Sequence, residues 1–347
     1  MIRLGYAGCQ ACHLSPQGRG LLTEYGKGID DAQSSRHGAY DADEDRWRRL
    51  FHDVRLMTQL TSEAREQPER ATSAAVRLWY RNTTRLSHTL RVSGTLSVDA
   101  PARAQEVTKL QPQPSQPQAF VRQALLEVTP HKNVYIGIGR DTLPSGVEIA
   151  DQATYVRARN GQGLTDVPTQ AKLFWSTERF QVAPYVYGPS GQEAPGFRSS
   201  GAGVLAEKYL VGDHLAAGIA LRMARNTTFD ERLAGVYARF GMGRWGVLTE
   251  HDVVRRAERS GEQRRFDQYT GFVQLFFYPT DWLVTSLSAD RLQMDAPYSD
   301  ARWYLRPEVS ARLNPHITIA ASLRDQYLLP SQRSTAFVLQ LFLKSVN

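Results

Sequence analysis

The chain has 347 residues, of which 42 are lysine or arginine and 35 are aspartate or glutamate, so its formal net charge is +7. Hydrophobic residues make up 41% of the chain, and no stretch approaches the ~20 consecutive apolar residues of a membrane-spanning helix, which excludes a bundle of membrane helices. The positive charge is spread along the chain instead of gathering in a basic arm, which argues against a nucleic-acid partner.

The first recognisable motif lies near the start, where Cys9 and Cys12 are followed directly by His13. This Cys-x-x-Cys-His spacing is typical of covalent haem attachment. Two thiols three positions apart can form thioethers with the two vinyl groups of one porphyrin, and the adjacent histidine then lies under the iron. We therefore predict one covalent c-type haem, with Cys9 and Cys12 holding the porphyrin and His13 as the proximal iron ligand.

Other interpretations of this motif remain open. A thioredoxin-like dithiol requires a βαβ context, which residues 14–20 do not offer. A structural zinc site needs four ligands, and only a distant histidine could complete the set. A lipoprotein cleavage box requires a preceding apolar segment, which the eight residues before Cys9 do not supply. A coincidental match is the last alternative.

The second axial ligand of the iron is not determined by spacing alone. The candidates nearest in sequence are His37, His52 and Met57. Ligation by two histidines or by histidine and methionine favours electron transfer, whereas an open position permits ligand binding. No distal acid–base group can be recognised beside the motif, so we expect no catalytic residues and no enzymatic activity.

Apolar and polar residues alternate along most of the chain from about residue 70 onward. This period of two predicts β-strands with one apolar and one polar face. The alternating segments are about ten residues long, as in the tilted strands of membrane barrels, whereas soluble sheets typically use five or six. Clear examples are residues 90–98, 214–223, 302–313, 316–324 and 337–343.

Connections between these strands alternate in length, as do the periplasmic turns and external loops of outer-membrane barrels. We expect short turns at residues 83–87, 130–133, 212–213, 241–243, 279–281 and 314–315. We expect long polar loops at residues 99–118, 140–168, 188–199, 255–265, 293–301 and 326–334. About fifteen strands follow residue 73, and an even total requires one more, which residues 50–60 can supply. That stretch also fits a helix.

The sequence thus predicts an all-β, transmembrane antiparallel β-barrel of about 16 strands, with 14 or 18 as alternatives, over residues 47–347. A soluble β-sandwich is the competing fold. Seven arginines at inward positions suit a water-filled lumen: Arg77, Arg91, Arg222, Arg302, Arg306, Arg312 and Arg324. Aromatic residues near strand ends suit interface girdles: Trp79, Tyr80, Trp175, Tyr185, Tyr187, Trp245, Trp282, Trp303 and Tyr304.

Residues 1–46 form the predicted haem segment, mostly helical or irregular and too short to bury a core of its own. We expect it to pack on the periplasmic mouth of the barrel. Haem attachment and barrel insertion both take place outside the bacterial cytoplasmic membrane, so we expect a signal sequence that the given start does not show.

Two stretches carry a resemblance to known proteins: residues 9–26 with the haem motif, and Val134–Asp141 together with Tyr155–Gly161. The chain resembles bacterial proteins that join an N-terminal monohaem c-type motif to an outer-membrane barrel, and it is similar to the porin component of porin–cytochrome conduits. The resemblance implies electron transfer at or across the outer membrane. It also implies outer-membrane lipid and other c-type cytochromes or redox mediators as partners.

Two functions from different classes are therefore expected. In the first, the haem transfers electrons, and another redox protein completes the route because one haem cannot bridge a hydrocarbon layer about 30 Å thick. In the alternative, the chain is a porin, general or anion-preferring, with the haem segment as a plug or gate. The lumen arginines would then raise the local concentration of anionic solutes.

Overall fold

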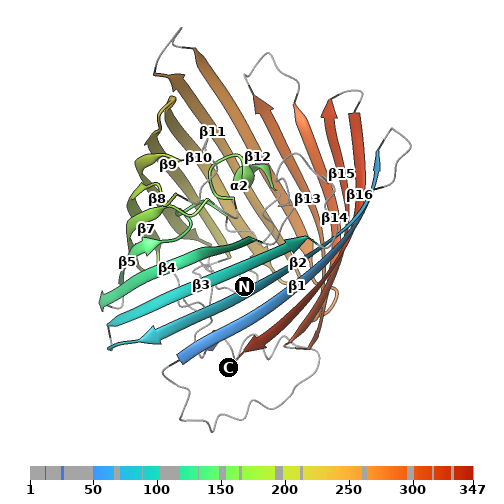
Figure 1. Ribbon diagram of the computed structural model, residues 1–347, viewed down its shortest axis with the longest axis horizontal. Helices are drawn as coiled ribbons and strands as arrows, with labels where there is room; N and C mark the ends of the chain where they lie inside the picture. The colour runs from blue at the N-terminus through green and yellow to red at the C-terminus, as the bar shows by residue number, and fades with distance from the viewer. Residues whose placement is uncertain are drawn as a thin grey trace. The chain divides into compact units, whose positions relative to one another are not determined.

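The computed structural model describes residues 12, 25–26, 50–65, 71–87, 89–101, 118–131, 133–147, 154–163, 166–191, 198–211, 214–259, 264–294, 301–314, 316–329 and 332–346. Sixteen strands in these ranges form one closed antiparallel barrel. Every strand pairs with its neighbours in sequence, and β1 closes the sheet against β16 (Figure 1). The predicted fold and strand number are therefore confirmed.

The first half of the barrel consists of β1 (Leu50–Arg65), β2 (Ala71–Arg85), β3 (Leu90–Pro101), β4 (Gln118–His131), β5 (Val134–Arg140), β6 (Thr169–Ser176), β7 (Phe180–Gly188) and β8 (Ser200–Leu210). The second half consists of β9 (Leu215–Arg225), β10 (Phe229–Met242), β11 (Trp245–Glu258), β12 (Arg265–Phe277), β13 (Leu283–Met294), β14 (Arg302–Asn314), β15 (Ile317–Leu329) and β16 (Gln332–Val346). The helix α2 (Tyr155–Ala158) follows β5. No helix among these described ranges is long and apolar enough to cross a membrane.

The stretch that fitted either a strand or a helix is the strand β1, which pairs with both β2 and β16. In the β1–β2 ladder Val54 lies opposite Tyr80, and Leu56 lies opposite Leu78, so the apolar face continues from one strand to the next. An antiparallel sheet of this connectivity closes only with an even number of strands. Closure of the barrel therefore explains why this stretch is a strand, although its local periodicity fits a strand or a helix.

The strands range from 7 to 16 residues, and most of them are longer than the length of about ten residues that the sequence predicted. The long loop expected at residues 326–334 is wrong, because β15 continues to Leu329 and β16 begins at Gln332. A bidentate ion pair between Arg333 and Asp325, with distances of 2.8 and 2.6 Å, joins the two strands near their ends. Charged cross-strand pairs can extend a ladder that contains few apolar residues.

Alternation along the strands separates an apolar outward face from a polar inward face. On β9, Ile219, Leu221 and Met223 are exposed, whereas Ala220 and Arg222 are buried. All seven arginines predicted at inward positions share the face of their strands' buried residues. The aromatic prediction holds for the exposed Tyr80, Trp175, Trp245, Trp282 and Trp303. It is wrong for Trp79, Tyr185, Tyr187 and Tyr304, which are buried at inward positions.

The chain divides into two compact units. The loop-bearing unit contains residues 1–7, 122–275 and 288–304, and therefore β5 to β11, most of β4 and β12, and α2. The terminal unit contains residues 8–121, 276–287 and 305–347, and therefore β1 to β3, β15, β16 and most of β14. The principal apolar core lies in the loop-bearing unit and includes Leu125, Val156, Phe174, Val254 and Phe272.

Candidate functional site: the charged lumen and its inner loop

We call the connection between β5 and β6, residues 141–168, the inner loop. Its described parts, residues 141–147, 154–163 and 166–168, fold into the barrel. The sequence predicted a polar external loop here, and that prediction is wrong. Residues 141–145 and all of α2 are buried, and Val147 and Val156 belong to the principal core. The signal that could have revealed this is the apolar content of the segment, since Leu143, Val147, Tyr155 and Val156 have no place in a solvated loop.

Three carboxylates on the inward faces of β11 and β13 hold the inner loop. The Val147 amide donates to Glu250 Oε2 at 2.8 Å, and the Tyr155 amide donates to Asp290 Oδ1 at 3.2 Å. The Asn160 side chain donates to Asp252 Oδ2 at 2.7 Å. Buried backbone N–H groups require acceptors, and here acids of the wall replace water in that role. The loop is therefore fixed to the wall at three separated points.

Asn160 is the most connected residue of the inner loop. Its Nδ2 also donates to Thr270 Oγ1 at 3.0 Å, and its Oδ1 accepts from Gln268 Nε2 at 2.9 Å. Its backbone oxygen accepts from Arg222 Nη1 at 2.7 Å. Arg222 lies on β9, Asp252 on β11, and Gln268 and Thr270 on β12. The side chain and the backbone carbonyl of Asn160 therefore join the loop to three strands.

The beginning of the inner loop is fixed by β6. Lys172 Nζ lies 2.5 Å from Asp141 Oδ2, and Gln170 Nε2 donates to the carbonyl oxygens of Asp141 and Thr142 at 2.7 and 2.8 Å. Further along, a Cβ built on Gly146 would lie 2.7 Å from Glu250 Oε1 and 2.9 Å from Tyr237 Cδ1. The loop therefore approaches the wall as closely as a residue without a side chain allows.

Most of the described cations on the inward face of the loop-bearing unit are in ion pairs. Glu231 accepts from Arg222 Nη2 at 2.7 Å and from Arg256 Nε at 2.8 Å. Glu207 pairs with Arg239. On the inner loop, burial lowers the pKa of Arg159, and the positive charges of Arg302 and Arg256 lower it further. Positive groups are thus crowded beside the loop.

The sequence predicted two inward cations of this unit, Arg222 and Arg302, but its other inward cations and all of its inward acids were missed. The wall carries the cations Lys172, Arg222, Arg239, Arg256 and Arg302 and the acids Glu127, Glu207, Glu231, Glu250, Asp252, Glu258 and Asp290. Applying the same alternation to acidic residues would have found them. Their burial among partners is what the sequence could not show.

The terminal unit carries a different set of inward charges. Its described inward side chains include the cations Arg77, Arg81, Arg91, Arg306, Arg312 and Arg324 and the acids Asp99 and Glu308. Arg77 makes a bidentate pair with Asp99 at 2.6 Å, and its guanidinium lies 5.5 Å from the ring centroid of Trp79. Among the described inward side chains of this unit, cations therefore outnumber acids by six to two.

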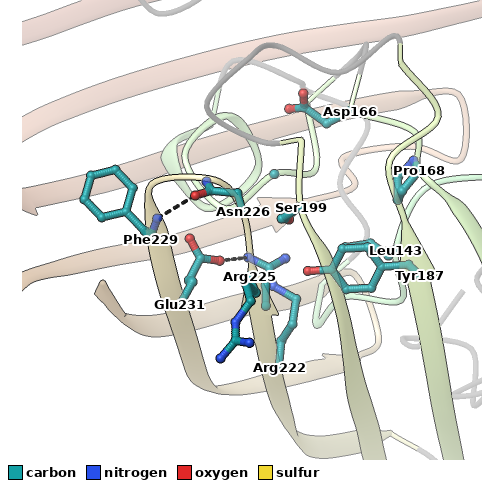
Figure 2. A pocket seen from close by; sticks show the side chains of 12 residues that line it. Leu143, Asp166, Pro168, Tyr187, Ser199, Arg222, Arg225, Asn226, Phe229 and Glu231 are labelled. Atoms are coloured by element: carbon teal, nitrogen blue, oxygen red, sulfur yellow. Dashed lines mark hydrogen bonds and ion pairs between the residues drawn. The ribbon is translucent and has the colours of Figure 1, made fainter. Parts of the chain in front are cut away.

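A small recess, partly open to solvent, lies where the inner loop meets the ends of β7, β9 and β10 (Figure 2). Its lining includes Tyr187, Ser199, Arg222, Asn226 and Glu231. Figure 2 shows the Arg222 side chain between Glu231 and Tyr187. Arg222 Nε is buried and has no hydrogen-bond partner among the described residues.

The residues predicted to hold a haem are described only in part. Cys9, His13 and His37 lie outside the described residues, whereas Cys12 is a buried residue in a turn. His52 and Met57 both lie on β1, where they pair with Asn82 and Arg77.

Met57 is on the inward face, where its sulfur lies 3.8 Å from Gln340 Nε2. Within the described ranges, no three His, Cys, Asp or Glu side chains are grouped as a metal site. Haem attachment and all three distal candidates, His37, His52 and Met57, stay predictions.

No family model matches the chain, and no curated protein matches its sequence. Solved structures do match. OprB of Pseudomonas putida aligns with a TM-score of 0.67 and 8% identity, over 85% of this chain and 94% of its own. A loop L8 deletion mutant of Vibrio cholerae OmpT aligns with a TM-score of 0.63 and 11% identity, over 86% of this chain and 100% of its own. An anion-selective porin from Comamonas acidovorans aligns with a TM-score of 0.63 and 10% identity, over 85% of this chain and 99% of its own. This chain therefore has the β-barrel fold of bacterial outer-membrane porins.

Proposed function

We propose that the chain is a porin of the bacterial outer membrane, with a lumen narrowed by the inner loop. This was the alternative to electron transfer in the sequence analysis, and it is now the better supported function. The outward face supports membrane insertion, because large apolar side chains such as Leu221, Val236 and Val253 are exposed there. Such a surface is unfavourable in water and suits a hydrocarbon layer.

The observation that carries the proposal is the inner loop fixed against a charged wall. An interior lined with Arg, Glu, Asp and Gln side chains would be strongly unfavourable in a dry core, because buried charges lose their hydration. It is the lining expected of a water-filled channel. The anchored loop then occupies part of the cross-section on the side of β9 to β13, which restricts passage to small solutes.

The charge distribution supports a preference for small anions. In the loop-bearing unit five of the seven described inward acids pair with arginines or hold the inner loop, so little of the charge of these five faces a solute: Glu207, Glu231, Glu250, Asp252 and Asp290. The terminal unit has an excess of positive charge on its inward face. Fixed positive charge raises the local concentration of anions. One of the similar structures, from Comamonas acidovorans, is an anion-selective porin, which agrees with this preference.

The proposal is tested by reconstituting the purified, folded chain into planar lipid bilayers. We expect discrete conductance steps and, under a KCl gradient, a reversal potential displaced toward that of chloride. Barrels that insert without conducting would contradict a diffusion channel. A reversal potential displaced toward that of potassium would retain the channel but contradict the anion preference.

A second proposal rests on the Cys9–Cys12–His13 motif: the segment before β1 carries one covalent haem, which supplies one-electron exchange, with other c-type cytochromes or redox mediators as its partners. The buried Cys12 is compatible with a thioether inside a packed segment. The test is a haem stain and a pyridine haemochrome spectrum of protein purified from outer membranes, compared with Cys12→Ala. We expect the variant to lose covalent haem and keep a folded barrel. A colourless wild-type protein would reject the haem and leave the porin proposal intact.

A further inference from the structure

The outward face of the barrel carries an arginine-rich area at the ends of β9 to β12, next to the long loops. We call it the outer arginine patch: Arg225, Arg232, Arg255 and Arg265, all exposed. The acids on the same face are Asp230 and Asp267. None of these arginines faces the lumen, because the inward positions of the strands are Arg222, Glu231, Arg256 and Gln268. The proposed channel does not use them.

Ladder register places two arginines of the patch directly opposite each other. In the β10–β11 ladder Arg232 pairs with Arg255, and the preceding outward pair toward the membrane is Ala234 with Val253. Like charges directly opposite each other on one face of a sheet are unfavourable. Asp267 makes a bidentate pair with Arg255 at 2.8 and 2.9 Å. The Arg232 side chain has no ion pair within the described part of the chain, so one positive charge is left beside another.

The position of this pair along the barrel coincides with the edge of the apolar band. Trp245 is exposed at the opposite end of β11, ten residues from Arg255. Ten residues span about 33 Å along a strand, or about 25 Å along the axis for a strand tilt of about 40°. The apolar band of an outer-membrane barrel is about 25 Å tall. When Trp245 lies at one interface, Arg232 and Arg255 lie at the level of the headgroups of the other leaflet.

The strand β13, next to β12, carries a further outward arginine near the level of Arg232 and Arg255. Arg291 on β13 lies between the rings of Tyr269 and Trp303, 5.3 Å from each centroid, and its Nη2 donates to Gln293 Oε1 at 2.9 Å. Aromatic faces hold a guanidinium without neutralising its charge. This arginine is therefore positioned beside the patch but not paired with a carboxylate in these contacts.

We propose that the outer arginine patch binds the phosphorylated headgroup of a lipid in the leaflet at the long-loop end of the barrel. A phosphate between Arg232 and Arg255 would relieve their repulsion and accept bidentate hydrogen bonds from both guanidinium groups. The inference rests on the proposed porin function only in requiring that the barrel lies in a membrane. It makes no use of the lumen or of the inner loop.

The test compares Arg232→Gln/Arg255→Gln with a matched control, Lys208→Gln/Arg244→Gln, which removes the same charge at the opposite end of the barrel wall. Each folded barrel in neutral detergent is titrated with lipid A carrying two phosphates, with the same lipid lacking one phosphate, and with inorganic phosphate, and bound lipid is counted by native mass spectrometry. We expect the patch variant to bind the two-phosphate lipid about thirtyfold more weakly than wild type, and the control variant to match wild type.

The outcomes separate this inference from the porin proposal, because bilayer conductance is measured on the same preparations. If all variants conduct as wild type does and bind the lipid equally, the lipid site is rejected and the porin remains. If the two variants lose the same affinity, general surface charge explains the binding, and the site is also rejected. Displacement of the lipid by millimolar inorganic phosphate would show a phosphate site without a lipid requirement, which would likewise overturn the inference. A wild-type barrel that binds lipid but does not conduct would contradict only the porin.

Discussion

The two units of the barrel have similar strands but use their inward charges differently. In the loop-bearing unit, the Arg222 side chain is 4% exposed and Glu231, 15% exposed, pairs with both Arg222 and Arg256. In the terminal unit, the side chains of the inward ion pair Arg77 and Asp99 are 21% and 13% exposed. Cations outnumber acids among the described inward side chains of this unit. The first arrangement is structural and holds a loop. The second leaves net charge for a solute. Net charge of a lumen therefore does not measure the charge that a permeating ion meets.

The largest change should follow from removing the inner loop. Replacing residues 143–166 with two glycines should raise single-channel conductance about twofold or more, because the loop no longer fills the lumen. It should also shift selectivity toward cations, because Glu250, Asp252 and Asp290 lose the donors that they bind now. Conductance and reversal potential in planar bilayers measure both effects. Unchanged selectivity would mean that these acids are not accessible to ions, contrary to our interpretation.

The next effect concerns stability and separates the two units directly. Glu231→Gln removes the carboxylate shared by Arg222 and Arg256, and breaking a buried pair in this way should lower the free energy of unfolding by about 3–5 kcal/mol. Asp99→Asn in the terminal unit should cost about half as much, because Arg77 stays within reach of water. Urea unfolding in detergent micelles, followed by intrinsic fluorescence, compares the variants. Equal losses would contradict the distinction between the units.

The sequence predicted the strands and several inward arginines of both units, but not the inner loop that distinguishes them. Alternation gave the strands, the closed barrel and the inward arginines, because a period of two depends only on which residues are next to each other. It could not reveal that residues 141–168 turn inward, since this depends on donors such as the amide of Val147 meeting Glu250, about a hundred residues away. It also placed Tyr185 and Tyr187 at a membrane interface, although their positions have the same parity as the inward Gln181 and Ala183.

A smaller effect is expected from neutralising the terminal unit. Arg306→Gln/Arg312→Gln/Arg324→Gln removes three of the six described inward cations of this unit, so the anion-to-cation permeability ratio should fall to about one. Conductance in symmetric salt should change little, because the inner loop is untouched. The matched variant Glu308→Gln should move the ratio in the opposite direction. A ratio that stays at the wild-type value in the triple variant would assign selectivity to the loop-bearing unit instead.

A single side chain should loosen the inner loop without removing it. In Gly146→Val the new Cβ would lie within 2.9 Å of Glu250 and Tyr237 side-chain atoms, so the loop must shift and weaken the bond from Val147 to Glu250. Such overpacking destabilises by about 1–3 kcal/mol, and we expect more frequent current fluctuations in bilayer recordings. Gly188→Ala is the control, because the nearest atom to its Cβ would be Ser200 Oγ at 3.6 Å, which is an ordinary van der Waals contact. Similar fluctuations in both variants would argue against loop anchoring by Glu250.

The smallest effect, the response to salt, tests the comparison without any mutation. The Debye length is about 10 Å at 0.1 M salt and about 3 Å at 1 M, so ions in a water-filled lumen should screen the terminal unit's arginines strongly at the higher concentration. The anion preference should therefore decline toward unity between 0.1 and 1 M KCl. The ion pairs of Glu231 are shielded by burial and should not weaken comparably, so the unfolding midpoint should stay nearly constant over the same range. The opposite result would be an unfolding midpoint that salt lowers while the anion preference persists. That result would contradict our assignment of structural charges to the loop-bearing unit and of solute-facing charges to the terminal unit.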